Sequence, residues 1–509
     1  MQNQVAAKRT GLNIASQWGL NITNIVINFF LIGYVIAKVG TEHYGGWTAI
    51  VSIIGYLSVL DAGMSIAIQH YVARFSTSRD KSEKLSSLFS SAYAVYGVSS
   101  VVAALLCVGI SLVYPSVFPK VPPEASGECV VALRWVSVSI LLFMLSMPVR
   151  GALLGLQRHY IRNTIEVLSL LVRVGVVVIC FNLFGPSLAY LGAAFLGAVL
   201  VSFVLSVIAL RLIEPDLCFR FSSVTWASIR EVFSYGGHSF FWTIATVIVR
   251  DSGPILATIL INPVAATYLY VGTRLVRSVG IFIMSAGHVF VPVVSSLQAS
   301  KENSRLQGVL IRGTRLCCLL ALSGATVLIM FGRAILCHWV DFEDLSSYLV
   351  VVIVTVGRLG IWMFNVPAVV LMGMRVLWPL TIMFVICAGS CFILMPLLAY
   401  YCGILGLAVG MLLPLFLAYT SWIPYKSCRL TGTSGGRFLL ESLTAPVSVA
   451  LIVGAAALII QRIWAPTELW IVVAELGIML AVFGGLSMWI GLDQMSRSLL
   501  LSKMRRAEH

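Results

Sequence analysis

Long apolar segments follow one another along nearly the whole chain, and they constrain its fold more than any other feature. Segments of about 20 mostly apolar residues are typical of transmembrane helices. Only 11% of the 509 residues are charged, against roughly a quarter in soluble globular proteins. The sequence therefore predicts an all-α polytopic membrane protein with about fourteen spans. The predicted spans are 13–38, 45–70, 86–114, 129–153, 161–184, 188–213, 233–260, 264–296, 308–332, 345–373, 376–400, 403–425, 444–464 and 467–491.

The distribution of positive charge predicts the orientation of these spans. Lysine and arginine accumulate in cytoplasmic loops of membrane proteins. If the N-terminus is cytoplasmic, most of the 34 lysines and arginines fall on the cytoplasmic side, including Arg74 and Lys81 after the second span. The few near the outer side are Lys38, Lys120, Arg134, Arg333 and Arg462. We therefore predict two cytoplasmic termini and attribute the net charge of +14 to topology, not to nucleic-acid binding.

A weak internal repeat has a constant offset of 224 residues. Trp18 matches Trp242, Tyr44 matches Tyr268, and Asp61-Ala62-Gly63 matches Ser285-Ala286-Gly287. The alternative is chance similarity between hydrophobic segments. The repeat predicts two six-helix lobes with the substrate handled between them. The predicted parts are an N-lobe at 1–213, a linker at 214–231, a C-lobe at 232–426, a cytoplasmic loop at 427–443, an extra helix pair at 444–491 and a basic tail at 492–509.

The first span contains an unusual number of amide side chains. On a helix with 100° per residue they fall within an arc of about 80°. A one-sided polar stripe favours a helix that faces a water-filled cavity compatible with sugars. The alternative is that the amides hydrogen-bond to neighbouring helices. The amides are Asn13, Gln17, Asn21, Asn24 and Asn28, and we assign the last four to substrate binding.

Charged residues inside predicted spans are candidates for function, because each costs at least ~2.5–3.5 kcal/mol near the bilayer centre. The arginines are Arg150, Arg173, Arg250, Arg274, Arg277 and Arg358. The acids are Asp61, Glu166, Asp251 and Glu475. Arginines outnumber acids, which favours an anionic ligand. Arg150 lies near the end of its span, where it can snorkel to the interface, and is therefore set aside.

Two of these arginines stand three residues apart on one helical face. Arg274 and Arg277 repel each other unless an anion bridges them, and the planar guanidinium suits phosphate or carboxylate. Arg358, isolated in the middle of its span, has the same requirement. The alternative is structural salt bridges to acids on other helices. We predict that these three residues bind the anionic part of a substrate.

The seventh span combines charge with a helix breaker. Arg250 and Asp251 are adjacent, so on a regular helix they point in different directions and are expected to be poor partners. Pro254 follows closely and removes a backbone donor, so we predict a broken helix beside a transport site. Glu166 and Arg173, two turns apart, are expected to form a structural pair.

Asp61, Asp251 and Glu166 are candidates for ion coupling, because a buried carboxylate can take up and release a proton during a transport cycle. The alternative is that they serve as fixed counter-charges for the arginines. The sequence contains no Walker A motif, no cysteine or histidine spacing for a metal and no catalytic constellation. We therefore expect no catalytic residues, no metal and no cofactor.

Two segments carry a resemblance to a known family. They are VGTEHYGGWTAIVSIIGYLSVLDAGMS, with its G-x-x-x-Y-G and L-D-x-G elements, and VRGALLGLQRHYIRN. Over roughly residues 8 to 430 the chain resembles the polysaccharide-transport and O-antigen flippases of the multidrug/oligosaccharidyl-lipid/polysaccharide exporter superfamily. The resemblance implies a MATE-like fold that opens alternately to each side. The extra helix pair is similar to the lipid II flippase branch, whereas many relatives have twelve helices.

The resemblance also implies a function in cell-surface polysaccharide synthesis, such as that of O-antigen or lipopolysaccharide. Such flippases move undecaprenyl-diphosphate-linked oligosaccharide to the outer leaflet of the bacterial plasma membrane, using an ion gradient. The expected partners are this substrate, membrane lipids, and a polysaccharide polymerase with chain-length proteins, and we expect a monomer. The alternatives are a multidrug/cation antiporter of the same fold, a membrane-embedded glycan polymerase or ligase, and a structural partner without transport activity.

Overall fold

The structure is a computed structural model that describes residues 2–61, 63–75, 81–215, 217, 220–463 and 469–487. Within these ranges it is helical, without strands. The chain divides into two compact units, Met1–Thr267 and Tyr268–His509, and the division falls inside one helix, α9. The predicted tail at 492–509 lies outside the described residues, and the predicted lobe boundaries stay predictions.

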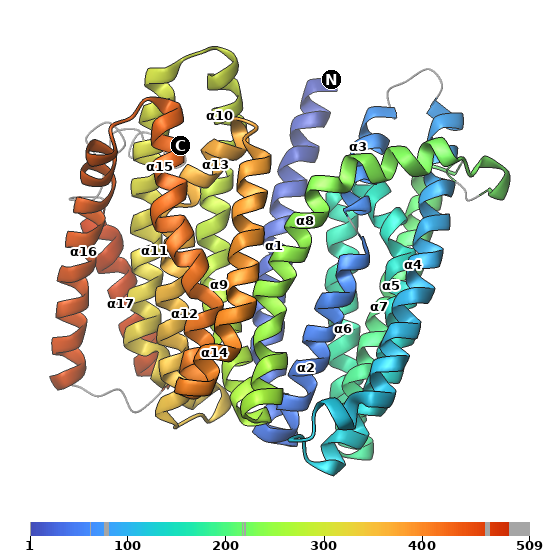
Figure 1. Cartoon of the computed structure of the whole chain (residues 1–509), viewed down its shortest axis with the longest axis horizontal. Helices are drawn as coiled ribbons and strands as arrows, with labels where there is room; N and C mark the ends of the chain where they lie inside the picture. The colour runs from blue at the N-terminus through green and yellow to red at the C-terminus, as the bar shows by residue number, and fades with distance from the viewer. Residues whose placement is uncertain are drawn as a thin grey trace. The chain divides into compact units, whose positions relative to one another are not determined.

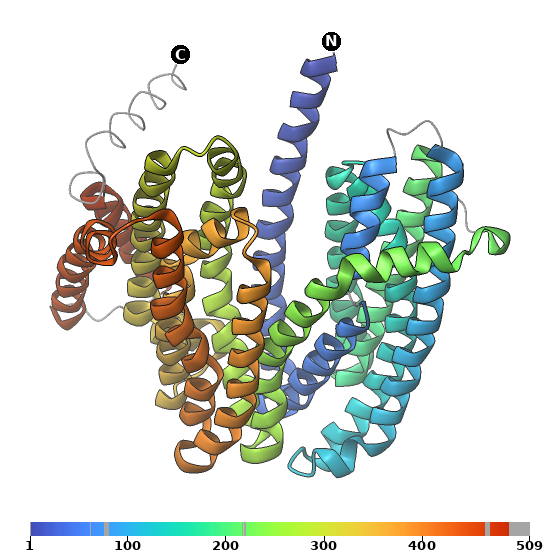
Figure 2. The same ribbon diagram turned by 45° about the horizontal axis from the view of Figure 1, so that its top comes forward.

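The first unit is built around α5, which packs on α4 and α7, while α6 packs on α7 and α1. Helix α8 crosses α2, α3 and α4 (Figures 1 and 2). The elements are α1 (Gln2–Val39), α2 (Thr41–Leu57), η1 (Ser58–Asp61), α3 (Met64–Phe75), α4 (Lys81–Val117), α5 (Pro123–Gly155), α6 (His159–Phe184), α7 (Leu188–Ile213), η2 (Phe221–Ser223), α8 (Trp226–Leu256), η3 (Ala257–Ile261) and α9 (Pro263–His288).

The second unit is organised around α11, which packs on α12, α16 and α17, and α12 packs in turn on α14. The short helices α10 and α13 contact each other (Figure 1). The elements that follow α9 are α10 (Phe290–Ala299), α11 (Asn303–Val340), α12 (Leu345–Met363), α13 (Asn365–Gly373), α14 (Leu377–Leu417), η4 (Ala418–Trp422), α15 (Ile423–Thr431), α16 (Gly435–Ile463) and α17 (Leu469–Leu486).

The lengths and surfaces of these helices are those of membrane spans. Eleven helices in the described part are long and apolar enough to cross a bilayer, or twelve if the bent pair Thr41–Asp61 and Met64–Phe75 forms one span. On α4, Val98, Leu105 and Leu112 lie seven residues apart and are 68%, 65% and 69% exposed. Such an apolar stripe is stable when it faces lipid. The count of fourteen spans and the sides of the termini stay predictions.

The two units share a helix ending that the sequence comparison missed. After Gly155 the chain turns at Gln157, which has a φ of 57°, and after Gly373 it turns at Arg375, with a φ of 58°. The hydrogen bonds are equivalent: Gln157 N–H donates to Leu154 O, and Arg375 N–H donates to Met372 O. Both glycines also permit close packing, on Val72 of α3 and on Val294 of α10. This recurrence supports an internal repeat more strongly than the matched residues do.

Candidate functional site

Helices α2 and α8 approach each other most closely at a pair of polar residues in the first unit. A Cβ atom on Gly55 would lie 2.2 Å from Asp251 Oδ2. In the next position along each helix, the hydroxyl groups of Tyr56 and Ser252 form a hydrogen bond. Asp251 is therefore seated against α2 at a position where only glycine leaves enough room for its carboxylate.

The prediction that Arg250 and Asp251 are poor partners is wrong. Arg250 Nε lies 3.0 and 2.9 Å from the two carboxylate oxygens of Asp251, and its Nη2 lies 2.6 Å from Oδ2. The long arginine side chain reaches around the helix, although consecutive Cβ atoms differ by about 100° in direction. The Arg250 side chain is 38% exposed and that of Asp251 only 14%. The pair thus neutralises a carboxylate that α2 largely covers.

The prediction of a broken helix at Pro254 is also wrong. Helix α8 continues through Pro254 to Leu256, and the hydrogen-bond pattern changes only afterwards, in the π-helical turn η3. Proline removes a single backbone donor, and here the main chain stays helical without it. The π-helical turn beyond the proline is an irregularity of a kind that is frequent at functional sites.

Asp61 lies where α2 gives way to α3, at the end of the 3-10 turn η1. Its two carboxylate oxygens accept hydrogen bonds from the hydroxyl groups of Tyr96 on α4 and of Ser65 on α3. Gly63, with a φ of 75°, allows the chain to turn there. Because both oxygens are engaged by hydroxyl groups that can also accept, protonation of Asp61 requires this network to rearrange. That property suits a coupling carboxylate.

The amides of α1 divide into two groups. Asn13 makes contacts to the start of α6: its Nδ2 donates to Gln157 O, and its Oδ1 accepts from Tyr160 N–H. Gln17 donates to Asn21, and Asn28 donates to Asn24, in pairs four residues apart on α1 itself. Asn13 therefore fits the packing alternative. A role for the other four amides in substrate binding stays a prediction.

Glu166 belongs to an ion cluster that differs from the predicted pair with Arg173. On α6 it forms an ion pair with Arg150 of α5, and Arg162 Nη2 lies 3.8 Å from its Oε1. The Arg150 side chain is only 12% exposed. The expectation that Arg150 snorkels to the interface is therefore wrong, because a carboxylate on the neighbouring helix compensates its charge inside the unit.

The remaining predicted arginines lie in the second unit. On α9 the guanidinium of Arg274 stacks over the ring of Tyr270, with 5.0 Å from Cζ to the ring centroid, and Arg277 is exposed. On α12, Arg358 interacts electrostatically with Tyr419 of η4. Gly357 and Gly360, on either side of Arg358, allow α12 to approach Leu412 and Phe416. No ion pair of Arg358 occurs within the described residues.

Sequence reasoning missed the tyrosines that partner these charges. Tyr96 contacts Asp61, Tyr270 contacts Arg274, and Tyr56 contacts the residue after Asp251. Tyr270 could have been found, because it lies four residues before Arg274 and so shares its helical face. Tyr56 and Tyr96 have no such local signal, since their partners lie on other helices.

Comparison with known proteins places these observations in context. A family model described as "Polysaccharide biosynthesis protein" matches residues 11–298, more than half of the chain. The chain is also 22% identical over 474 residues to the uncharacterized membrane protein EpsK of Bacillus subtilis (strain 168), with 89% of each chain covered.

Solved structures share the fold at low sequence identity. The chain is similar to the lipid II flippase MurJ in its inward closed conformation, with a TM-score of 0.72 and 13% identity over 96% of this chain and 99% of that one. It is similar to an inward-facing multidrug resistance MATE family transporter, with a TM-score of 0.62 and 13% identity over 82% and 96% of the two chains. The predicted all-α, MATE-like fold is confirmed.

Proposed function

Because the chain belongs to the polysaccharide biosynthesis protein family, we propose that it moves an undecaprenyl-diphosphate-linked oligosaccharide from the cytoplasmic to the outer leaflet of the bacterial plasma membrane. The membership also confirms the resemblance to polysaccharide flippases of the exporter superfamily. In this proposal the chain works by alternating access and is driven by an ion gradient. The product serves the synthesis of a cell-surface polysaccharide.

The observation that carries the proposal is the cationic face of α9. Arg274 and Arg277 are one helical turn apart, and Arg274 rests on the ring of Tyr270. Stacking uses the face of a guanidinium, whereas phosphate oxygens bind the N–H groups along its edge. Two guanidinium groups at this spacing suit a diphosphate, which carries several negative charges. Arg250 and Arg358 are further candidates for the same anion.

The amides and acids receive separate roles. Gln17, Asn21, Asn24 and Asn28 supply polar groups for sugar hydroxyls, and their mutual hydrogen bonds keep them satisfied when no sugar is bound. Among the coupling candidates, Asp61 is favoured because hydroxyl groups surround it and no arginine is paired with it among the described residues. Asp251 and Glu166 both face arginines and fit the role of counter-charges better.

Flipping of a fluorescent lipid-linked oligosaccharide in proteoliposomes tests this function. We expect the wild type to transport the lipid faster with an inward-directed or outward-directed ion gradient than without one. Arg274→Ala and Arg277→Ala should each lower the rate at least about tenfold, since a charge-assisted contact to phosphate contributes roughly 1.5–3 kcal/mol. Arg305→Ala is the matched control, because Arg305 is 74% exposed and pairs only along its own helix. Equal rates in empty vesicles and with the wild type would sink the proposal.

A multidrug or cation antiporter is the second candidate, favoured by the likeness to a MATE transporter. Such a protein needs acidic groups for cationic substrates. In the first unit the acids Asp251 and Glu166 are paired with arginines, and α9 adds two positive charges. The antiporter therefore predicts export of a cationic dye that survives Arg274→Ala but not Asp61→Asn.

A further inference from the structure

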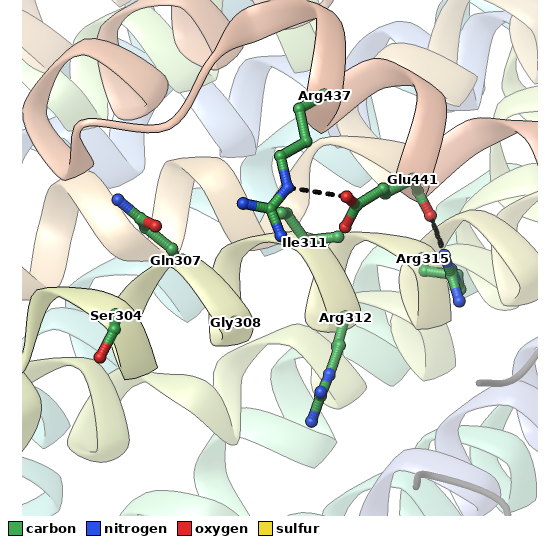
Figure 3. A pocket seen from close by; sticks show the side chains of 8 residues that line it. All are labelled: Ser304, Gln307, Gly308, Ile311, Arg312, Arg315, Arg437 and Glu441. Atoms are coloured by element: carbon green, nitrogen blue, oxygen red, sulfur yellow. Dashed lines mark hydrogen bonds and ion pairs between the residues drawn. The ribbon is translucent and has the colours of Figure 1, made fainter. Parts of the chain in front are cut away.

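A cavity in the second unit has a cationic lining that the proposed transport does not use. It lies between the first turns of α11 and α16 and has a volume of about 280 Å³ (Figure 3). Three guanidinium groups and one carboxylate give the lining an excess of positive charge. Its polar lining residues are Ser304, Gln307, Arg312, Arg315, Arg437 and Glu441.

The two helices hold this charge in place. Arg437 Nε donates to Glu441 Oε1 at 2.7 Å, one turn away on α16. Arg315 Nε of α11 donates to the backbone carbonyl of Glu441 at 2.7 Å, so one residue anchors both arginines (Figure 3). Arg312 lies at the opposite edge of the cavity and points away from this pair. One carboxylate cannot neutralise three guanidinium groups, and the lining remains complementary to an anion.

The position of the cavity along the helices places it at the membrane surface. On α11 the next charged residue after Arg315 is Arg333, and 18 residues of helix span about 27 Å. On α16 no charged residue separates Glu441 from Arg462 in the sequence, a helical distance of about 31 Å. Both values match a hydrocarbon core of about 30 Å. The cavity thus lies at headgroup level, on the side that the positive charges predict to be cytoplasmic.

The surface below the cavity is apolar and exposed. Leu440, Leu451 and Leu458 lie on one line of α16 and are 65%, 68% and 56% exposed. A free phosphate compound in the cytoplasm has no use for such a face, whereas the acyl chains of a lipid would cover it. We infer that this cavity binds the phosphate headgroup of an anionic membrane phospholipid, whose acyl chains run along α16.

Native mass spectrometry of the full-length protein in detergent, with phosphatidylglycerol added, tests the inference. We expect a phosphatidylglycerol adduct that phosphatidylcholine of the same chain length does not replace. Arg437→Gln and Arg312→Gln should each weaken binding about fivefold, because an arginine near a membrane surface contributes roughly that much to anionic lipid binding. Both side chains lie at the surface, so either variant alone is expected to fold.

Arg305→Gln provides the matched control, since Arg305 lies on α11, pairs with Glu302 and does not line the cavity. It should bind phosphatidylglycerol like the wild type. Equal weakening by Arg305→Gln, or no preference for phosphatidylglycerol over phosphatidylcholine, overturns the inference. Inorganic phosphate that binds as tightly as the lipid and is lost in the same variants also overturns it, because the cavity would then be a site for free phosphate. The measurement involves no transport and is independent of the proposed function.

Discussion

Gly55 of α2 and Asp251 of α8 are separated by 196 residues in the sequence, yet a Cβ atom on the glycine would lie 2.2 Å from the carboxylate oxygen Oδ2. This contact brings the Arg250–Asp251 pair against α2. It also explains why the neighbouring hydroxyl groups of Tyr56 and Ser252 meet. The relationship makes α2 and α8 sensitive to one methyl group.

Gly55→Ala should therefore destabilise the first unit by about 1–3 kcal/mol, as overpacking of a close contact does. The measurement is thermal unfolding of the purified protein in detergent. Gly97→Ala is the control, because an added Cβ on α4 meets no atom within 4 Å, and it should be neutral or slightly stabilising through helix propensity. If both variants melt at the wild-type temperature, α2 and α8 do not pack as described.

Removing one member of the Arg250–Asp251 pair should cost more than removing both. Arg250→Ala leaves a carboxylate that is 14% exposed without its partner, and we expect a loss of about 1–3 kcal/mol in the free energy of unfolding. The double variant Arg250→Ala/Asp251→Ala should recover part of that loss. A double-mutant cycle measures the coupling. Strictly additive effects would show that the pair contributes nothing.

Asp61→Asn should abolish the stimulation of flipping by an ion gradient while keeping transport without a gradient. Asparagine has nearly the same shape and can still accept from Tyr96, but it does not titrate. Tyr96→Phe should weaken the stimulation less, because Ser65 still contacts the carboxylate. Tyr93→Phe, one turn away on α4, serves as the control. Full gradient stimulation in Asp61→Asn would assign the coupling to another group.

Glu166→Gln should lower stability without changing the flipping rate per folded molecule. Its carboxylate lies between Arg150 and Arg162, and the variant leaves two cations facing each other with Arg150 largely buried. We expect a loss of roughly 3 kcal/mol or more, as for a broken buried pair. Unfolding and flipping are measured on the same preparation. Normal stability with lost gradient stimulation would instead return Glu166 to the coupling candidates.

The helices and the fold class were predictable because hydropathy and charge are local properties. A segment such as 86–114 must span a membrane whatever its neighbours are, and the structure has a helix at Lys81–Val117. The repeat of 224 residues was visible, although its clearer form, the turns at Gln157 and Arg375, depends on backbone angles that no residue pattern announced. The low identity to MurJ shows that such a fold survives extensive change in sequence.

The partners of the charges were not predictable to the same degree. That each intramembrane arginine or acid needs compensation follows from the sequence, since an isolated charge is too costly in hydrocarbon. Which group supplies it follows only from packing: Glu166 meets Arg150 because α5 and α6 pack together, and Asp61 meets Tyr96 because α4 passes the break between α2 and α3. Local chemistry sets the requirement, and the contacts between helices far apart in the sequence determine how it is met.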